Sequence, residues 1–561
     1  MSTRRRFLSS FSTFGLSATL LPGILWARVQ DAGGARVTPA MLREAARLAG
    51  LELSDEEQQG MIGTLNRILD RVIELHRAPA DNGAPSPLVF NPRVAGEAVD
   101  VPRRPFQPTA APRQARPAAA DDLLFLPVTH LADLVRRREV SAVELAELAL
   151  ARMARHNPVL NCVVTPTPER ALARARELDR ELAAGIYRGL LHGLPYGVKD
   201  IVAARGYRTT WGAAPFEQRV IDLDAAVVER LTEAGAVLVA KLTSGELAFG
   251  DQWYGGRTNN PWNPEEGSSG SSAGSGAATA AGLVAFAIGT DTGGSILSPA
   301  VRCGVVGLRP TFGRVSRHGV MNAGWTLDKV GPMARHVEDC AIVLQAIAGP
   351  DGRDLAVPPE PPPGWDPREP VRGRRVGIVP AVLEAEPDPA VRANTARAID
   401  ALRDAGVELR EVSVPQSDLT YFIEYTERAA GFETFVQRGE DRGLRRQRHA
   451  SELRAYHMVT AVDYLQANRE RYALMEAYAR ATREVDAVVA GSVTLTGATS
   501  LNPITSLTGH PAIAVPTGVR DNGTPTGMTV AGRLYDEAGL LHLARVIESA
   551  TGLGTRRPPG F

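Results

Sequence analysis

Three short stretches of the sequence combine serine or lysine with glycine and could therefore carry out chemistry. They are "LPYGVKD", which contains Lys199, "GSSAGS", which contains Ser271, and "GTDTGGS", which ends at Ser295. A serine hydroxyl becomes a nucleophile when a neighbouring base removes its proton, and a lysine can be that base only when it is neutral. Each stretch alone is weak evidence, because glycine and serine usually form turns and a lysine after an apolar strand is usually solvated.

The second stretch lies in a run of unusual composition. Residues 268–276 contain only serine, glycine and one alanine, which is typical of a flexible linker. The apolar sequence "AATAAGLVAFAIG" follows at once and predicts a buried helix and strand. Because a disordered linker would not precede such a segment so tightly, we expect the run to be ordered.

The chain from residue 122 onward alternates helical and strand-like segments. "AAVVERLTEAG" has the apolar spacing of a helix, and "AVLVAKL" follows it as a short apolar strand. Such alternation predicts an α/β sheet protein. A proline-rich piece at 349–370 is interpreted as a long surface loop inside this fold, and a domain boundary there is the alternative.

Two further segments precede this region. Residues 37–77 are predicted to form a helical pair, with Thr38 before the first helix and a capping box, Ser54 with Glu57, before the second. The apolar stripe of the second helix is expected to pack on something. Residues 78–121 contain nine prolines and are predicted to form an extended tether.

Residues 1–27 have the layout of an export signal. The sequence "TRRRFL" resembles the twin-arginine signal, with Arg4 and Arg5 as the pair, and a weakly apolar run follows it. Gly15 and Pro22 interrupt that run, so a spanning helix is not favoured. We expect a periplasmic or extracellular protein with no stable membrane insertion after signal removal; an uncleaved membrane anchor is the alternative.

The overall composition argues against several classes of partner. Lysine plus arginine balance aspartate plus glutamate at 63 each, which gives no electrostatic basis for binding nucleic acid. The three cysteines, Cys162, Cys303 and Cys340, are widely spaced and are interpreted as small buried hydrophobic residues. The histidines form no metal-binding motif. We therefore expect neither a metal nor another cofactor.

From residue 122 to residue 557 the chain resembles the amidase signature family. The resemblance is carried by "LHGLPYGVKDI", "DAAVVERLTEAGAVLVAKL", "NNPWNP", "GTDTGGSI", "CGVVGLRPTFGRVSRHG" and "LTGHPAIAVPTG", in the family's order. Ser271 and Ser295 also reproduce the family's separation of 24 residues between two serines. The resemblance implies the family's α/β fold, a central mixed β-sheet covered by helices on both faces.

The resemblance also implies residue roles. Ser295 would be the nucleophile that becomes acylated, Ser271 would relay its proton, and Lys199 would be the base, with a cis peptide between Gly270 and Ser271. The oxyanion would be bound by backbone N–H groups, which we expect to be those of Thr292, Gly293, Gly294 and Ser295.

The remaining polar residues of these motifs have structural interpretations. Asp200 and Asp291 are expected to accept hydrogen bonds from the backbone rather than to act in catalysis. Four further serines of the run are interpreted as turn or helix-cap residues: Ser268, Ser269, Ser272 and Ser275. Leu297 stands where many relatives have arginine, which we expect to alter substrate preference.

Three functions remain open. The first is an exported serine amidohydrolase that acts on a small carboxamide and water. The second is an A-type component of a glutamine-dependent tRNA amidotransferase, because the catalytic half resembles the A component of that enzyme and residues 37–77 resemble its small C component. The third is a non-catalytic binding protein, which the presence of Lys199, Ser271 and Ser295 disfavours. A homodimer is left open.

Overall fold

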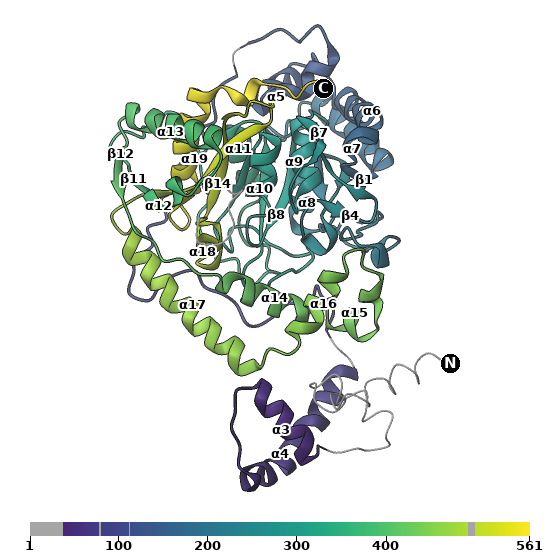
Figure 1. Ribbon diagram of the computed structural model, residues 1–561. Helices are drawn as coiled ribbons and strands as arrows, with labels where there is room; N and C mark the ends of the chain where they lie inside the picture. The colour runs from purple at the N-terminus through teal and green to yellow at the C-terminus, as the bar shows by residue number, and fades with distance from the viewer. Residues whose placement is uncertain (1–36, 78–79, 112, 492–499) are drawn as a thin grey trace.

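The computed structural model describes residues 37–77, 80–111, 113–491 and 500–561. The predicted signal, residues 1–27, lies outside these ranges. Within them, eleven strands form one sheet in the order β1-β3-β2-β8-β10-β9-β14-β15-β13-β11-β12 (Figure 1). The strands are β1 (Val163–Pro166), β2 (Pro195–Lys199), β3 (Val237–Leu242), β8 (Phe286–Asp291), β9 (Val306–Arg309), β10 (Lys329–Ala334), β11 (Arg375–Ile378), β12 (Glu408–Glu411), β13 (Ala487–Gly491), β14 (Ala512–Val519) and β15 (Pro525–Gly532).

The sheet is mixed, as predicted. Strand β2 runs parallel to both β3 and β8, and β11 runs parallel to β12 and β13. In the centre of the sheet, β10 runs antiparallel to β8 and β9, and β14 runs antiparallel to β9 and β15. Two small hairpins lie outside the sheet: β4 (Gln252–Trp253) with β5 (Gly256–Arg257), and β6 (Asn259–Asn260) with β7 (Asn263–Gly267).

Helices cover both faces of the sheet. The α-helices are α3 (Pro39–Leu48), α4 (Asp55–Arg77), α5 (Val128–Arg136), α6 (Ala142–Leu160), α7 (Pro168–Ala183), α8 (Ala226–Glu233), α9 (Ala273–Ala280), α10 (Leu297–Cys303), α11 (Val337–Ile347), α12 (Pro380–Glu384), α13 (Pro389–Asp404), α14 (Leu419–Gly431), α15 (Glu433–Gln437), α16 (Gln447–Tyr456), α17 (Ala461–Thr482), α18 (Asn502–Leu507) and α19 (Glu537–Thr551). One layer contains α8, α11, α19 and α13, which contact one another in that order, and α9 packs beside α10 in another.

The central strands are buried on both faces. Every residue of β2, β3, β8 and β10 is buried, which explains why these segments are mainly apolar rather than alternating. Each has one charged residue at or next to an end of the strand. Tyr196 of β2 stacks on Phe286 of β8, with 5.4 Å between ring centroids. The strand ends that carry polar residues are therefore held by a rigid core.

The helical pair begins as the sequence predicts. Thr38 accepts a hydrogen bond from the N–H of Met41 at the start of α3. Ser54 and Glu57 cap α4 reciprocally, since each side chain accepts from the backbone N–H of the other. These contacts fix where both helices start.

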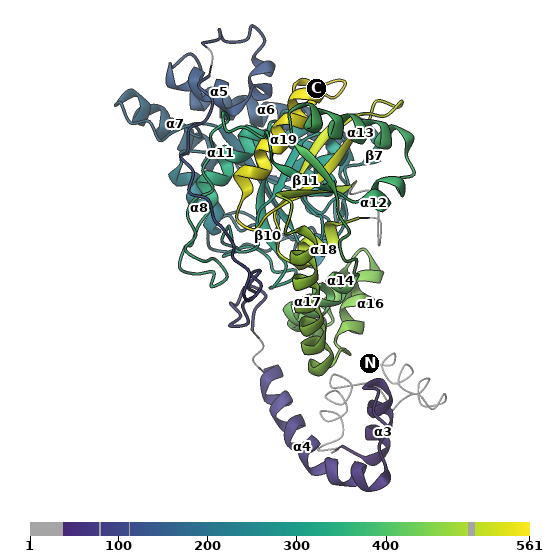
Figure 2. The same cartoon turned by 90° about the vertical axis from the view of Figure 1, so that its left-hand side faces the viewer.

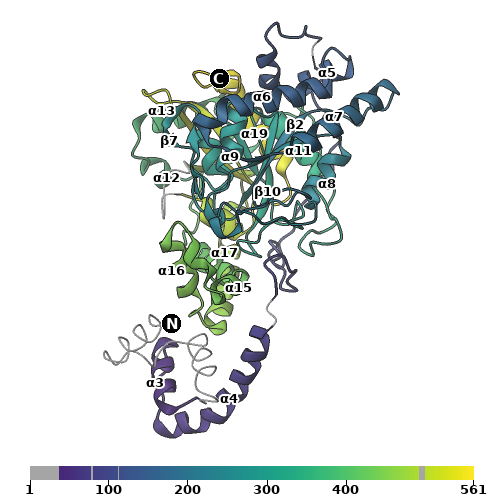
Figure 3. The same ribbon diagram turned by 90° about the vertical axis from the view of Figure 1, so that its right-hand side faces the viewer.

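The expectation that the apolar stripe of α4 is packed is wrong in part. Leu69 is buried, but Ile68 and Leu75 are 51% and 55% exposed. Figures 1, 2 and 3 show α3 and α4 projecting from the body on the side of α15, α16 and α17. In a pair of helices, each helix has only the other to cover its apolar stripe. Helix α3 packs along one side of the stripe of α4, and the other side stays exposed.

The proline-rich segment is extended and lies against the body. It contains no helix or strand in its described residues before Ala120, where a short 3₁₀ helix (Ala120–Phe125) begins. Its anchoring contacts join the following pairs: Asn82 to Gly431, Arg93 to Glu360, Arg104 to Glu369 and Asp536, and Phe106 to Trp365. The tether is therefore a strap with fixed contacts along its length.

The second proline-rich piece is also free of helices and strands, as the loop interpretation predicts. Trp365 at its end is fully buried and donates from Nε1 to Glu338 at 2.7 Å. The loop therefore belongs to the same packed body as the sheet. In the described part of the chain, no helix is both long enough and apolar enough to cross a membrane.

Candidate active site

Lys199 ends strand β2 and is fully buried. Its Nζ donates hydrogen bonds to Ser271 Oγ and to Thr290 Oγ1, each at 2.8 Å. Thr290 lies on the neighbouring strand β8, one residue before that strand ends. The amine is thus held between two hydroxyl groups, and among the described residues no carboxylate is paired with it.

Burial changes the chemistry of this amine. Removal of the ammonium from water lowers the pKa of Lys199 from 10.5 to about 7, and Asp291 and Asp328 oppose the shift only in part. A lysine with this pKa is neutral in a large fraction of molecules near neutral pH. Lys199 can therefore accept a proton under conditions in which an exposed lysine cannot.

The serine-glycine run is ordered and closely packed. The Gly270–Ser271 peptide is cis, as the resemblance implies. Ser272 bonds reciprocally with Thr290: its hydroxyl donates to the Thr290 carbonyl at 3.0 Å and accepts from the Thr290 N–H at 3.1 Å. Ser275 donates to the Ile288 carbonyl at 3.0 Å. Ser272 and Ser275 thus fasten the second half of the run to β8.

These contacts revise part of the interpretation of the other serines. Ser272 occupies the N-cap position of α9, yet its side chain makes no capping bond, because it is bound to β8. Ser268 bonds to the adjacent Ser269 carbonyl, and Ser269 Oγ lies 2.6 Å from Ser298 Oγ. Ser268 makes the local bond expected of a turn serine, Ser269 joins the run to Ser298 of α10, and Ser272 and Ser275 join α9 to the sheet.

The glycines of the run allow the backbone to approach its neighbours. A β-carbon on Gly270 would lie 1.9 Å from the Gly250 carbonyl oxygen, and one on Gly274 would lie 2.4 Å from the Cys162 carbonyl oxygen. Such distances are far shorter than any van der Waals contact. The composition that resembles a linker is therefore a requirement of packing.

The turn after β8 is organised by Asp291. Its carboxylate accepts from the N–H groups of Gly294 at 2.8 Å and Ile296 at 2.7 Å, and Arg309 lies 3.3 Å from it. Burial alone would raise the pKa of Asp291, but Arg309, Lys329 and these N–H groups hold it below its usual value. Asp291 is thus a structural acceptor, as predicted.

The same contacts correct one predicted oxyanion donor. The N–H of Gly294 already donates to Asp291, so it does not point into an open site. Within the described residues, the N–H groups of Thr292, Gly293 and Ser295 have no protein acceptor. The turn therefore offers three of the four predicted amides, because the carboxylate that shapes it takes one.

Ser295 is half-buried at the end of this turn. Its carbonyl oxygen accepts from the N–H of Ser272 at 3.1 Å, which ties the turn directly to the residue after Ser271. The structure thus brings the loops of Ser271 and Ser295 together and places Lys199 on Ser271. Leu297, two residues after Ser295, is fully buried in the first turn of α10.

Asp200 is also structural, as predicted. It is fully buried and forms an ion pair with Lys241 of β3 at 2.7 Å. Its second oxygen accepts from the N–H of Thr210 at 2.9 Å and from the Thr210 hydroxyl. The three cysteines are likewise buried and free, and burial raises the pKa of Cys162 to about 12.

Two elements of the site do not follow from the sequence motifs as interpreted above. Thr290 stands inside "GTDTGGS", and its place in strand β8 could have indicated contact with Lys199. Glu424 and Arg428 form a buried ion pair on α14, and Glu424 lies beside Gly293. No local pattern reveals this, because more than a hundred residues separate α14 from the turn.

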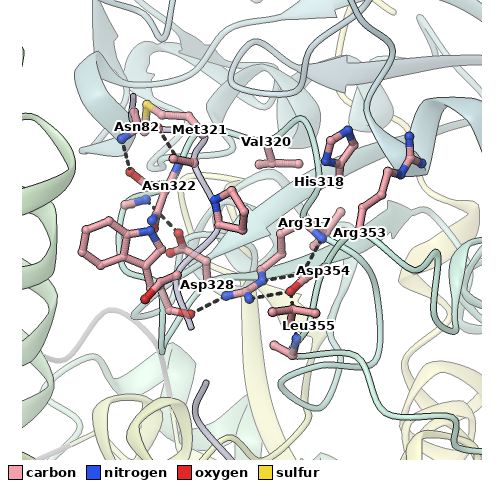
Figure 4. Close-up of a pocket in the computed structure, with 18 of the residues that line it drawn as sticks. Asn82, Arg317, His318, Val320, Met321, Asn322, Asp328, Arg353, Asp354 and Leu355 are labelled. Atoms are coloured by element: carbon pink, nitrogen blue, oxygen red, sulfur yellow. Dashed lines mark hydrogen bonds and ion pairs between the residues drawn. The ribbon is translucent and has the colours of Figure 1, made fainter. Parts of the chain in front are cut away.

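Thr290 also lines a cavity of about 380 Å³, and Figure 4 shows other residues of its lining. The tether forms one wall through Asn82, and Asp328 and Lys329 also line it. Arg317 crosses it and pairs with Asp354 at 2.8 Å. Neither Ser271 nor Ser295 lines this cavity, and Thr290 is where it adjoins the Lys199 network.

The protein thus has a mixed α/β sheet in which a buried lysine at the end of a strand, Lys199, contacts a serine, Ser271. The family model described as Amidase matches residues 144–541. The match spans well over half of the chain, and this chain belongs to the amidase family.

Curated relatives agree with this assignment. The chain is 38% identical over 482 residues to the A component of glutamyl-tRNA(Gln) amidotransferase from Methylococcus capsulatus, a match that covers 77% of this chain and 99% of the relative. The protein of the same description from Roseiflexus sp. is 36% identical, with 76% and 96% covered.

Solved structures of amidases share the fold. Native peptide amidase from Stenotrophomonas maltophilia superposes with a TM-score of 0.69 at 30% identity, covering 78% of this chain and 98% of that one. The 6-aminohexanoate cyclic dimer hydrolase, solved with its substrate, has a TM-score of 0.69 at 27% identity, with 78% and 99% covered. The relatives thus include both hydrolases and amidotransferase components.

Proposed function

We propose that this chain is a serine amidohydrolase that cleaves the C–N bond of a carboxamide through an acyl-enzyme. The observation that carries the proposal is the 2.8 Å contact between Lys199 Nζ and Ser271 Oγ. Burial has lowered the pKa of Lys199 to about 7, so this amine is a base at neutral pH. Peptide amidase, which shares the fold, supports hydrolysis as the reaction.

The proposed reaction proceeds in two halves. Ser295 Oγ forms a bond to the carbonyl carbon while its proton passes to Ser271, and the Ser271 proton passes to neutral Lys199. The C–N bond then breaks, and the proton returns through Ser271 to the leaving nitrogen. Water attacks the acyl-enzyme by the same route, which releases a carboxylic acid and restores Ser295.

The oxyanion of each tetrahedral intermediate would be bound by the turn after β8. The N–H groups of Thr292, Gly293 and Ser295 have no acceptor among the described residues. Fixed backbone donors of this kind cost no reorganisation during the reaction. Gly294 contributes indirectly, because its bond to Asp291 holds the turn in shape.

A Ser295→Ala variant tests the proposal. It is expected to lose amide hydrolysis and also to lose labelling by a fluorophosphonate, because both require this hydroxyl. Ser298→Ala is the matched control, since Ser298 is a nearby hydroxyl that bonds to Ser269 instead. Hydrolysis by Ser295→Ala at the wild-type rate, or labelling at another residue, would refute the assignment.

The amidotransferase relatives favour a second candidate. The chain covers nearly the whole length of these relatives at up to 38% identity, and their description makes each of them one part of a larger enzyme. Glutamine hydrolysis that appears only when partner proteins and tRNA are added would support this function. Hydrolysis of simple amides by the purified chain alone supports the first.

We further propose that the protein is exported by residues 1–27 as a twin-arginine substrate. The "TRRRFL" sequence supports this, and export would separate the enzyme from aminoacyl-tRNA. A reporter fused to residues 1–35 should reach the periplasm, and Arg4→Lys with Arg5→Lys should retain it inside. A reporter that stays inside without these changes would favour the amidotransferase function.

A further inference from the structure

The carboxyl group of Glu424 is buried beside the turn that precedes Ser295. Glu424 is 5% exposed. Its Oε2 would lie 3.6 Å from a β-carbon placed on Gly293, so it is among the nearest side-chain atoms to that glycine. The N–H of Gly293 is one of the donors assigned to the oxyanion. Any substrate held by these donors would therefore be close to this carboxyl oxygen.

One oxygen of Glu424 is used and the other is not. Oε1 accepts from the Arg428 guanidinium at 2.5 Å. Oε2 accepts no hydrogen bond from another described residue. Unlike the fully enclosed polar atoms without a partner, it remains accessible to solvent. A nearly buried carboxylate normally fills both oxygens. Oε2 therefore has an accepting position that faces an open space.

Glu427 on the same helix shows the ordinary arrangement. Its Oε1 accepts from the Thr326 hydroxyl and the Tyr464 hydroxyl, and its Oε2 accepts from the Thr326 N–H at 2.9 Å. Both oxygens are thus occupied by the protein. The contrast between the two glutamates, one turn apart on α14, shows that the open position of Glu424 is not a general property of this helix.

The position of Glu424 is also rigidly set. Arg428 donates to the Leu247 carbonyl and stacks over the Phe249 ring, 4.0 Å from its centroid. Near the start of α14, Thr420 donates to the Pro503 carbonyl at 2.8 Å. Groups that determine specificity are effective when packing holds them in this way.

We propose that Glu424 is a specificity residue whose Oε2 accepts from an ammonium or N–H group attached within a few bonds of the scissile carbonyl. This inference rests on the proposed function. Burial raises the pKa of Glu424, and Arg428 opposes the rise. A cationic donor on the substrate would be a second positive partner for the Glu424 carboxylate, in addition to Arg428.

Two pairs of amides test the proposal. The first pair is leucinamide against 4-methylpentanamide, which differ by an ammonium on the acyl side. The second pair is the N-(2-aminoethyl) against the N-propyl amide of 4-methylpentanoic acid, which differ by an ammonium on the leaving side. Release of ammonia or amine gives kcat/KM, and slowing of fluorophosphonate labelling of Ser295 gives binding for any amide that is not turned over.

The wild type is expected to prefer the donor member of one pair by at least about tenfold. Glu424→Gln should lower kcat/KM or binding for that member by about ten- to a hundredfold, and for its donor-free partner by less than about threefold. The pair that responds identifies the side of the substrate. Glu427→Gln, the matched control, is expected to lower Tm and to keep the wild-type preference.

Three outcomes would overturn the inference: no preference in either pair, a preference that survives Glu424→Gln, or an equal loss on all four amides. Labelling of Ser295 in the wild type and in Glu424→Gln distinguishes a failure of this inference from a failure of the proposed function. If both proteins are labelled and the wild type hydrolyses any of the four amides, the hydrolase assignment stands whichever way the preference falls. A wild type that is neither labelled nor active overturns both.

Discussion

Two lysines lie one ladder position apart on neighbouring strands, and their side chains have different surroundings. Lys199 of β2 pairs with Leu242 of β3, and Lys241 pairs with Val198 one step back along the same parallel ladder. Both are fully buried. Among the residues that the structure describes, Lys199 Nζ bonds to the hydroxyls of Ser271 and Thr290 alone, whereas Lys241 Nζ bonds to the carboxylate of Asp200 at 2.7 Å.

This difference separates a base from a structural cation. Burial lowers the pKa of both lysines, but for Lys241 the adjacent Asp200 opposes the shift through its charge and its hydrogen bond. For Lys199 the opposing carboxylates, Asp291 and Asp328, act without a direct contact, and its pKa falls to about 7. Burial alone does not set the pKa of a lysine; whether a carboxylate is paired with the amine also does.

The largest expected effect follows from removing the amine that has no carboxylate. Lys199→Met should lower kcat/KM for amide hydrolysis by about a thousandfold, because proton transfer by a positioned base contributes that much. The free energy of unfolding should change by less than about 2 kcal/mol, since two hydrogen bonds are lost but an amine is no longer buried. Steady-state kinetics and denaturant unfolding measure the two quantities.

Lys241→Met is the matched control for this prediction. It removes the same group one ladder position away, and it leaves Asp200 as a buried carboxylate without its cation. Its main effect should be on stability rather than on the chemical step. If Lys241→Met abolished activity in folded protein while Lys199→Met did not, the two lysines would have been assigned the wrong way round.

The second prediction concerns Asp200. Asp200→Asn leaves Lys241 buried without a carboxylate, which should lower the free energy of unfolding by about 3–5 kcal/mol. The double variant with Lys241→Met should be more stable than Asp200→Asn alone, because the unpaired charge is gone. Denaturant unfolding of the four proteins gives the coupling. Independent, additive losses would show that the pair is not an interacting unit.

Part of this comparison could be predicted from the sequence, and the reason is local. "LPYGVKD" is a short apolar strand that ends in a lysine, so the position of Lys199 at a strand end follows from the sequence. Its full burial does not, because a lysine at such an end is usually solvated and here the whole strand is buried in the sheet. The capping box of α4 and the helix and strand after the serine-glycine run are equally local patterns.

The remainder depends on contacts between distant segments. That Gly294 donates to Asp291 depends on how one turn closes, and the glycine pattern alone does not show which amides stay free. Glu424 reaches Gly293 only because α14 packs against the turn. The stripe of α4 has the pattern of a buried face, yet Ile68 and Leu75 remain exposed, because periodicity reports a face and not its partner.

The third prediction concerns pH. Lys199 is a base only as the neutral amine, and burial lowers its pKa to about 7, so the active form increases as pH rises through 7. Between pH 6 and pH 8, kcat/KM should rise by about tenfold and then level off. Lys241→Met should retain this profile if folded. A flat or falling profile across this range would contradict the role of Lys199.

The smallest effect is expected from the second hydroxyl on Lys199. Thr290 Oγ1 accepts from Lys199 Nζ at 2.8 Å, and an acceptor stabilises the ammonium more than the amine. Thr290→Val should therefore lower the pKa of Lys199 further and move the rising limb of the pH profile to lower pH by about one unit.

Thr209→Val is the matched control, because it removes the corresponding hydroxyl from the other lysine, Lys241. Thr209 Oγ1 accepts from Lys241 Nζ at 2.9 Å, and Thr209 is fully buried. Its removal changes the surroundings of the paired lysine alone, so the pH profile should keep its wild-type midpoint. A midpoint that moves in Thr209→Val but not in Thr290→Val would mean that the titrating amine is Lys241, and that the hydroxyl cluster around Lys199 is the structural one.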